Sequence, residues 1–153
     1  MIFQNSSEFI SNVGKGSPLL SLDLGSKIIG IAISDRTLLI ATPLISLKRK
    51  KLTVDANKII EIIKNNDIGG IVVGLPINMG GSEGPMCQSV RQFTKNFIKL
   101  LDIPIFLWDE RMSSMAVESV LIEADMSRKR RGEVIDKVAA AYILQGFLDS
   151  LKK

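Results

Sequence analysis

Residues 19–34, LLSLDLGSKIIGIAIS, contain two apolar runs separated by the turn-forming residues GSK. Runs of this length and composition, joined by so short a connection, predict two antiparallel strands. Asp23 interrupts the first run, although a carboxylate in an apolar setting costs free energy unless something compensates its charge. Asp23 could be only a turn residue before Gly25, or it could belong to a functional site.

The rest of the chain extends this pair into an α/β pattern. LLIATPLISL at 38–47 predicts a third antiparallel strand, after which helices and strands alternate. Further strands are expected at 69–76 and 103–111. Helices are expected at 55–65 with Thr53 or Asp55 as the cap, at 85–101 beginning with Pro85, from Ser113 or Ser114 onward, and at 133–151.

These elements predict one domain over residues 18–153. It should contain a five-stranded mixed sheet, three antiparallel strands followed by two parallel ones, with helices on both faces. Residues 1–17 show no strong pattern and are expected to form a flexible N-terminal extension.

Composition excludes several kinds of chemistry. The chain has 153 residues, no histidine and one cysteine, Cys87, which excludes the common zinc sites and Cys/His nucleophiles. No apolar stretch is long enough to span a membrane, and no secretory leader is recognisable, so a cytoplasmic protein is expected. The net charge is +4, with basic runs at 48–51 (KRKK) and 128–131 (RKRR). Such runs fit a polyanionic partner or ordinary solvated loops.

Four carboxylates are predicted to converge. Asp23 ends the first strand, Asp109 and Glu110 end the last, and Asp136 shares a helix face with Ala140, Ile143 and Phe147. Each acid taken alone could be a turn or helix-terminus residue. Together they would repel one another, so a hard divalent cation, Mg²⁺ or Mn²⁺, is the expected compensation. Carboxylates holding two such ions can promote attack of water on a phosphodiester.

Four segments in order resemble one known family. LDLGSKIIGIAISD, IVVGLPINMGGSEGP, WDERMSS and GEVIDKVAAAYILQGFL are similar to the YqgF/RuvX family of ribonuclease H-like nucleases, over roughly residues 19–151. The resemblance implies a ribonuclease H-like fold, a monomer or homodimer, and a divalent-metal nuclease. The implied activity is processing of the 5′ end of pre-16S ribosomal RNA or resolution of Holliday junctions, so the expected partner is an rRNA precursor or branched DNA.

The resemblance also implies a site. The family's metal ligands fall on Asp23, Glu110 and Asp136, with Asp109 beside Glu110 as a further catalytic candidate. The family often has an acid where this chain has Gly80, so any auxiliary role of that acid is absent. Cations near the carboxylates are expected to contact the nucleic-acid backbone, and the candidates are Lys27, Arg111, Arg128, Lys129, Arg130 and Arg131. Arg111 could instead be an ion-pair partner that orients the acids.

Two other functions fit parts of this sequence. DLGS after a strand also resembles the phosphate loop of actin-like ATPases and sugar kinases, but those enzymes need two such domains and this chain supplies one. A non-catalytic RNA-binding or ribosome-assembly factor could share the fold and the basic runs, although the complete set of acids counts against it.

Overall fold

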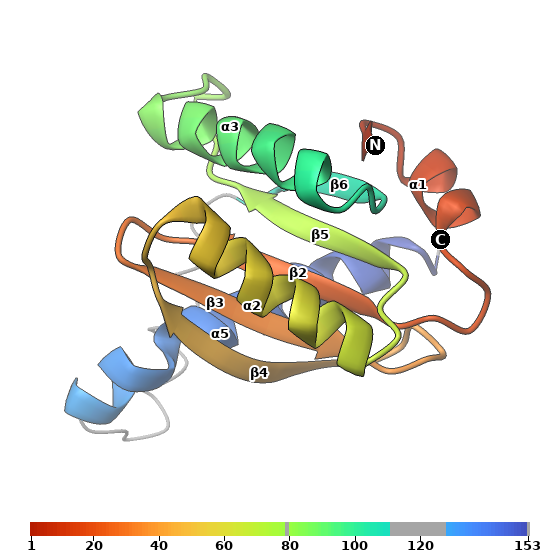
Figure 1. Cartoon of the computed structure of the whole chain (residues 1–153), viewed down its shortest axis with the longest axis horizontal. Coiled ribbons are helices and arrows are strands. Elements are labelled where there is room, and N and C mark those ends of the chain that lie inside the picture. The colour runs from red at the N-terminus through yellow and green to blue at the C-terminus, as the bar shows by residue number, and fades with distance from the viewer. Residues whose placement is uncertain (79, 111–127, 153) are drawn as a thin grey trace.

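The described strands of this computed structural model form one six-stranded sheet (Figure 1). The model describes residues 1–78, 80–110 and 128–152, and between 128 and 134 the backbone alone. Spatial order across the sheet is β1-β6-β5-β2-β3-β4. The strands are β1 (Ile2–Phe3), β2 (Leu19–Leu24), β3 (Ile28–Ser34), β4 (Ala41–Lys48), β5 (Gly70–Leu75) and β6 (Ile105–Asp109). The helices are α1 (Ser6–Asn12), α2 (Leu52–Asn65), α3 (Pro85–Leu100) and α5 (Arg128–Ser150).

The predicted mixed sheet is confirmed. β2, β3 and β4 pair antiparallel, whereas β5 pairs parallel with β2 and β6 pairs parallel with β5. The expected number of five strands is one too few, because β1 adds a parallel edge strand through the pairs Ile2–Ile105 and Phe3–Phe106. A two-residue strand has no periodicity that a sequence pattern could reveal.

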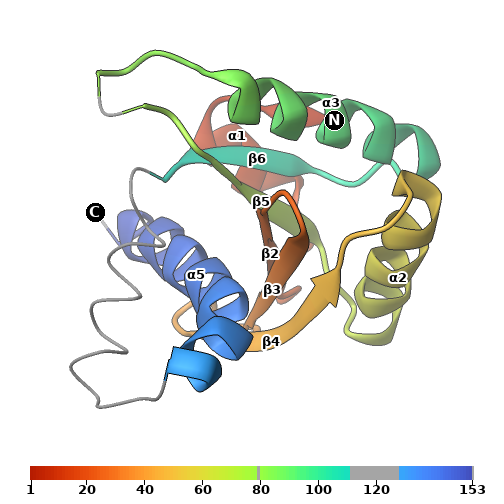
Figure 2. The ribbon, with the colours of Figure 1, turned by 90° about the vertical axis from the view of Figure 1, so that its left-hand side faces the viewer.

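The two faces of the sheet pack against different helices. Leu20, Leu22 and Leu24 of β2 are buried in the cluster that also contains the apolar residues of α2 and α3. Leu19 belongs to the second cluster, which is formed with α5. Because side chains alternate along a strand, Ser21 and Asp23 share the α5 face with Leu19. Figure 2 shows this layering, with α2 and α3 on one side of the sheet and α5 on the other.

The N-terminal residues are part of this core, which differs from the expected flexible extension. Phe9 on α1 is fully buried, and its ring lies 5.7 Å from those of Phe106 and Phe147. Gly70 makes this packing possible, because a Cβ there would lie 2.9 Å from the Phe9 ring. Seven residues with one buried aromatic give too weak a pattern to predict, and only contact with distant strands orders them.

Two helix starts differ from prediction. α2 begins at Leu52 and neither Thr53 nor Asp55 is its cap, because Lys51 occupies that position without a side-chain hydrogen bond. α5 begins at Arg128 rather than 133, so the backbone of the second basic run is helical, as suits long cationic side chains. α3 begins at Pro85 as expected.

The helix predicted from Ser113 or Ser114 lies outside the described residues. None of the described helices combines the length and apolarity that crossing a membrane requires.

Candidate active site

Asp23 lies on the α5 face of the sheet, between two glycines. It pairs with Gly30 on β3, and the register Leu22–Val73 on the other side, continued by one residue, brings Gly74 of β5 beside it. Neither neighbour has a side chain to cover the carboxylate. Both glycines therefore leave room for groups from other elements to approach Asp23.

The backbone of α5 approaches the sheet at Gly30. A Cβ on Gly30 would lie 1.9 Å from the carbonyl oxygen of Asp136, a distance that no real side chain could occupy. The Asp136 carboxylate lies on the same side, with its Oδ1 3.9 Å from the Cβ position of Gly25, in the turn that follows β2. Asp136 is thus held over the end of β2, although 113 residues separate it from Asp23 in the chain.

Gly74 leaves room for Glu110, as Gly30 leaves room for Asp136. A Cβ on Gly74 would lie 2.9 Å from Cγ and 3.1 Å from Cδ of Glu110, and 2.7 Å from Cδ1 of Ile143 on α5. The Glu110 side chain therefore lies over β5, on the α5 face, in the space that a side chain at 74 would fill. This is the strand that separates β6 from the strand of Asp23.

Asp109 lies on the opposite face. It pairs with Leu75, which belongs to the cluster under α2 and α3. Burial, followed by the charges of Glu83 and Asp109, raises the pKa of the Cys87 thiol on α3, which agrees with this direction. Of the two adjacent acids, the structure brings only Glu110 to the face of Asp23 and Asp136.

The protonation of Asp23 reflects its surroundings. Burial, and after it the nearby charge of Asp136, raises its pKa from 3.8 to about 6. Burial also raises the pKa of Asp136. Two partly desolvated carboxylates whose charges interact carry negative charge that a cation would stabilise.

The side-chain chemistry of these three residues fits a metal ion. Asp23, Asp136 and Glu110 offer only carboxylate oxygens, the ligands that Mg²⁺ and Mn²⁺ favour. As they stand, no three acidic or sulfur side chains within residues 1–78, 80–110 and 135–152 are grouped closely enough to hold an ion. Mutual repulsion is a physical reason for such carboxylates to stay apart until a cation compensates it.

The predicted nucleic-acid contacts are only partly covered by the structure. Lys27 is exposed in the turn between β2 and β3, directly beyond Asp23. Arg111 lies outside the described residues, and so do the side chains of Arg128, Lys129, Arg130 and Arg131. Gly80, at the place of the family's auxiliary acid, has no atom within 4 Å of its Cβ position.

Sequence reasoning overlooked the residues that shape the site. Gly30 and Gly74 interrupt otherwise apolar strands, a signal for close approach of another group, which could have identified them. Ser21 gave no such signal: it is fully buried, and its Oγ donates a 2.7 Å hydrogen bond to the carbonyl of Ala140 on α5. This bond ties β2 to the helix one turn beyond Asp136.

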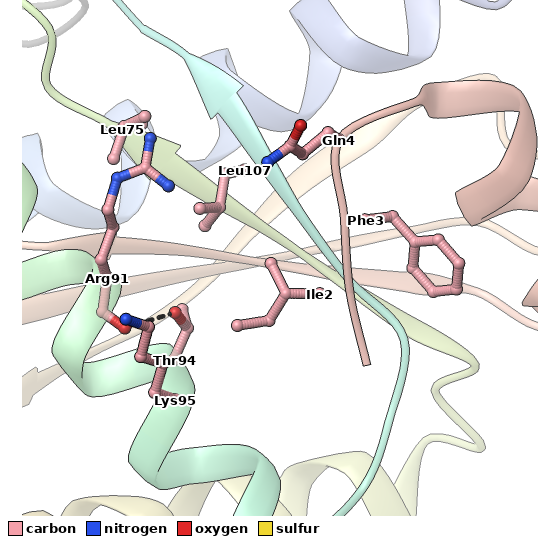
Figure 3. Close-up of a pocket in the computed structure, with 8 residues that line it drawn as sticks. All are labelled: Ile2, Phe3, Gln4, Leu75, Arg91, Thr94, Lys95 and Leu107. Atoms are coloured by element: carbon pink, nitrogen blue, oxygen red, sulfur yellow. Dashed lines mark hydrogen bonds between the residues drawn. The ribbon is translucent and has the colours of Figure 1, made fainter.

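A separate cavity lies on the other face of the sheet. It has a volume of about 330 Å³ and lies between α3 and strands β1 and β6. Figure 3 shows Ile2 and Leu107 on the strand side, opposite Arg91 and Lys95 of the helix. None of the acidic candidates lines it.

The fold is that of a class of α/β proteins in which solved structures of junction resolvases are found. The structure is similar to that of Thermus thermophilus RuvC in complex with a Holliday junction, with a TM-score of 0.52, 11% identity, and 88% of this chain and 96% of that chain covered. It is also similar to the Fowlpox virus resolvase in complex with Holliday junction DNA, with a TM-score of 0.51, 12% identity, and 89% and 99% covered. At sequence identities this low, the structural similarity shows that the fold is shared and nothing further.

Sequence comparison gives the family. Residues 17–150 match the model of the RuvX family, described as Holliday junction resolvase. A relative from Ruegeria sp. (strain TM1040) is 53% identical over 152 residues, with 99% of this chain and 97% of the relative covered. One from Paramagnetospirillum magneticum is 52% identical over 143 residues, with 94% and 92% covered. Both are provisionally named pre-16S rRNA nucleases. The chain belongs to the RuvX family, and it is a hydrolytic nuclease.

Proposed function

We propose that this chain is a divalent-metal-dependent nuclease that processes pre-16S ribosomal RNA in the cytoplasm. The observation that carries the proposal is the partly buried carboxylate of Asp23 beside Asp136, with Glu110 lying over Gly74 on the same face. Relatives that share about half of their residues with this chain, over nearly their whole length, carry the pre-16S rRNA nuclease name.

Asp23, Glu110 and Asp136 would hold Mg²⁺ or Mn²⁺. When bound, such an ion supplies positive charge for the developing negative charge at phosphorus and promotes ionisation of water. Asp23 would bind the ion from β2 and Asp136 from α5, and Glu110 would do so from the position directly after β6. Asp109 faces α3, so it has no direct role in this proposal.

Asp23→Asn tests the assignment. The substitution keeps the shape of the side chain and removes its charge, so we expect cleavage of a pre-16S RNA fragment to fall by about 10²-fold or more. Glu110→Gln should have a comparable effect, and Asp109→Asn a much smaller one. Mg²⁺ and Mn²⁺ titrations of the cleavage rate, with circular dichroism to verify folding, are the measurements.

Asp67→Asn is the matched control. Asp67 is exposed at the opposite end of the sheet and has a positive φ of 54°, which asparagine tolerates. Its exposed ion pair with Arg36 contributes little to stability. Cleavage by the Asp23 variant at the rate of this control would refute the proposed site.

Resolution of Holliday junctions is the second candidate, favoured by the family description and by the two resolvase structures. A four-way DNA junction and a generic single strand, assayed beside the RNA precursor, separate the two functions. Preferential cleavage of the junction at symmetric positions would favour the second candidate and would require a dimer, because a symmetric pair of cuts needs two active sites.

A further inference from the structure

The first basic run lies beside the turn that follows the strand of Asp23. Lys48 ends β4 and pairs with Ile28, the first residue of β3, and the Arg49 amide donates a 2.8 Å hydrogen bond to the Lys27 carbonyl. Residues 48–51 therefore adjoin the turn that directly follows Asp23. In Figure 1 this turn, the end of β4 and the N-terminal ends of α2 and α3 lie at the same end of the sheet, on the left.

Strand alternation directs Lys48 to the face of Asp23. Its neighbour Leu47 is buried in the cluster under α2, so Lys48 projects from the α5 face. Lys48, Lys50 and Lys51 are exposed, and no salt bridge involves them among the described residues. Three neighbouring cations that form no ion pair with any described residue create a local positive potential that favours a polyanion.

The backbone that carries these lysines is held in place. Nη1 of Arg49 donates a 2.7 Å hydrogen bond to the Gly25 carbonyl, and its guanidinium lies 5.7 Å from the centre of the Phe93 ring on α3. The Lys50 amide donates to both carboxylate oxygens of Asp55, at 3.1 Å each, and Asp55 is only 1% exposed. A solvated loop needs no such anchoring, whereas a preorganised binding surface benefits from it.

A hollow of about 270 Å³ continues from this segment towards α3. Its lining combines Arg49 and Lys50 with Ser89, Gln92 and Asn96 of α3, and it also includes Leu52, Phe93 and the buried Asp55. The Asp55 carboxylate accepts a hydrogen bond from the Lys50 amide. The cations and neutral hydrogen-bonding groups of the lining suit a sugar–phosphate chain, which offers anionic and hydroxyl oxygens together.

We propose that Lys48, Lys50 and Lys51 bind backbone phosphates of the substrate strand that leads away from Asp23 over the N-terminal end of α2. This inference rests on the proposed nuclease function and adds a contact surface separate from the carboxylates. Arg49 and Asp55 position the segment. The contacts read phosphates, which RNA and DNA share.

The test compares two triple variants with equal charge change. Lys48→Gln, Lys50→Gln and Lys51→Gln together remove the proposed contacts. Lys15→Gln, Lys64→Gln and Lys99→Gln remove three exposed lysines at the opposite end of the sheet, before β2 and in the last turns of α2 and α3. Binding to a pre-16S RNA fragment and to a four-way DNA junction is measured by fluorescence anisotropy between 50 and 300 mM salt, about the range in which counterion release dominates affinity. EDTA is present throughout to prevent cleavage.

We expect the slope of log affinity against log salt to become shallower by about 2 to 3 for the first triple variant, since each lost phosphate contact contributes about 0.7 to 0.9. The control triple should keep the wild-type slope. Equal slopes for the two variants would overturn the inference while leaving the nuclease assignment intact. If the wild type bound neither the RNA fragment nor the DNA junction, the inference and both proposed substrates would be overturned. Loss of cleavage in Asp23→Asn with unchanged salt slopes would support the carboxylate site independently.

Discussion

Asp23 has unusual surroundings for a residue of a core strand. Glycines on both neighbouring strands leave space on the α5 face, which Asp136 and Glu110 occupy from elements distant in the sequence. The arrangement brings negative charges together in a partly desolvated region, and the raised pKa of Asp23 to about 6 expresses that cost. The free energy of unfolding of the metal-free protein should therefore change with pH, in the direction that the raised pKa dictates.

We expect the metal-free protein to lose stability as pH rises from about 4 to about 6. The folded state keeps the Asp23 proton until about pH 6, whereas the unfolded chain releases it near 3.8, so the folded state binds more protons in this interval. Asp23→Asn cannot ionise, and it should increase the free energy of unfolding at pH 8 in EDTA by roughly 2 kcal/mol after allowance for partial exposure.

Urea unfolding at pH 4 and pH 8 measures this effect. The Asp67→Asn control should follow the wild-type pH dependence. Parallel pH profiles of the Asp23 variant and the wild type would show that Asp23 carries no such destabilisation in the folded state.

At the scale of elements, the contact between α5 and the sheet determines where Asp136 lies. Ser21 fixes the helix through its hydrogen bond to the Ala140 carbonyl, and Gly30 allows the helix backbone to come close one turn earlier. The helix and the strands β2 and β3 thus act as one unit in presenting the two acids. A side chain added between β3 and α5 should therefore move Asp136 away from Asp23, although neither acid is itself replaced.

Gly30→Ala provides this test. Its Cβ would collide with the backbone at Asp136, which cannot move aside as a flexible side chain could. We expect a loss of about 1 to 3 kcal/mol in the free energy of unfolding, typical of overpacking, together with slower cleavage. Gly80→Ala, with open space around its Cβ position, is the control and should change neither. Wild-type cleavage by the Gly30 variant would argue against a need for close approach at this point.

For the whole molecule, the N-terminal residues complete the second core. α1 covers the aromatic rings of Phe106 and Phe147 with Phe9, and β1 adds an edge to the sheet. The amino group of Met1 also forms an exposed salt bridge with Asp102. Removal of this segment would expose apolar surface on β6 and α5.

Phe9→Ala should lower the free energy of unfolding by about 3 to 5 kcal/mol, as for other fully buried aromatic residues. The control Asn5→Ala removes the cap of α1, the 3.1 Å bond from the Glu8 amide to Asn5 Oδ1, and should cost only about 1 kcal/mol. Urea unfolding measures both. If Phe9→Ala lowered the free energy of unfolding by less than Asn5→Ala does, residues 1–17 would behave as a loosely attached extension.

Much of the fold could be predicted because local patterns specify it. The two apolar runs of 19–34, the short turn at 25–27 and the continuous apolar run of β5 predict strand type and pairing directly, and Pro85 predicts where α3 begins. Asp23 was identifiable as a candidate because a carboxylate stands out in an apolar strand. Roles for the acids and cations beyond this geometry stay predictions until the variants are tested.

By itself, the sequence determined the mixed arrangement of β2 to β6, the presence of α2, α3 and α5, and the four candidate acids, because these depend on residue type and on spacing along a short segment. Only the tertiary structure decided that Glu110 faces α5 while Asp109 faces α3, since that direction depends on strand pairing. It also decided that residues 1–12 join the core and that Lys48–Lys51 lie beside Asp23. These relations join segments far apart in the chain, so no local pattern contains them.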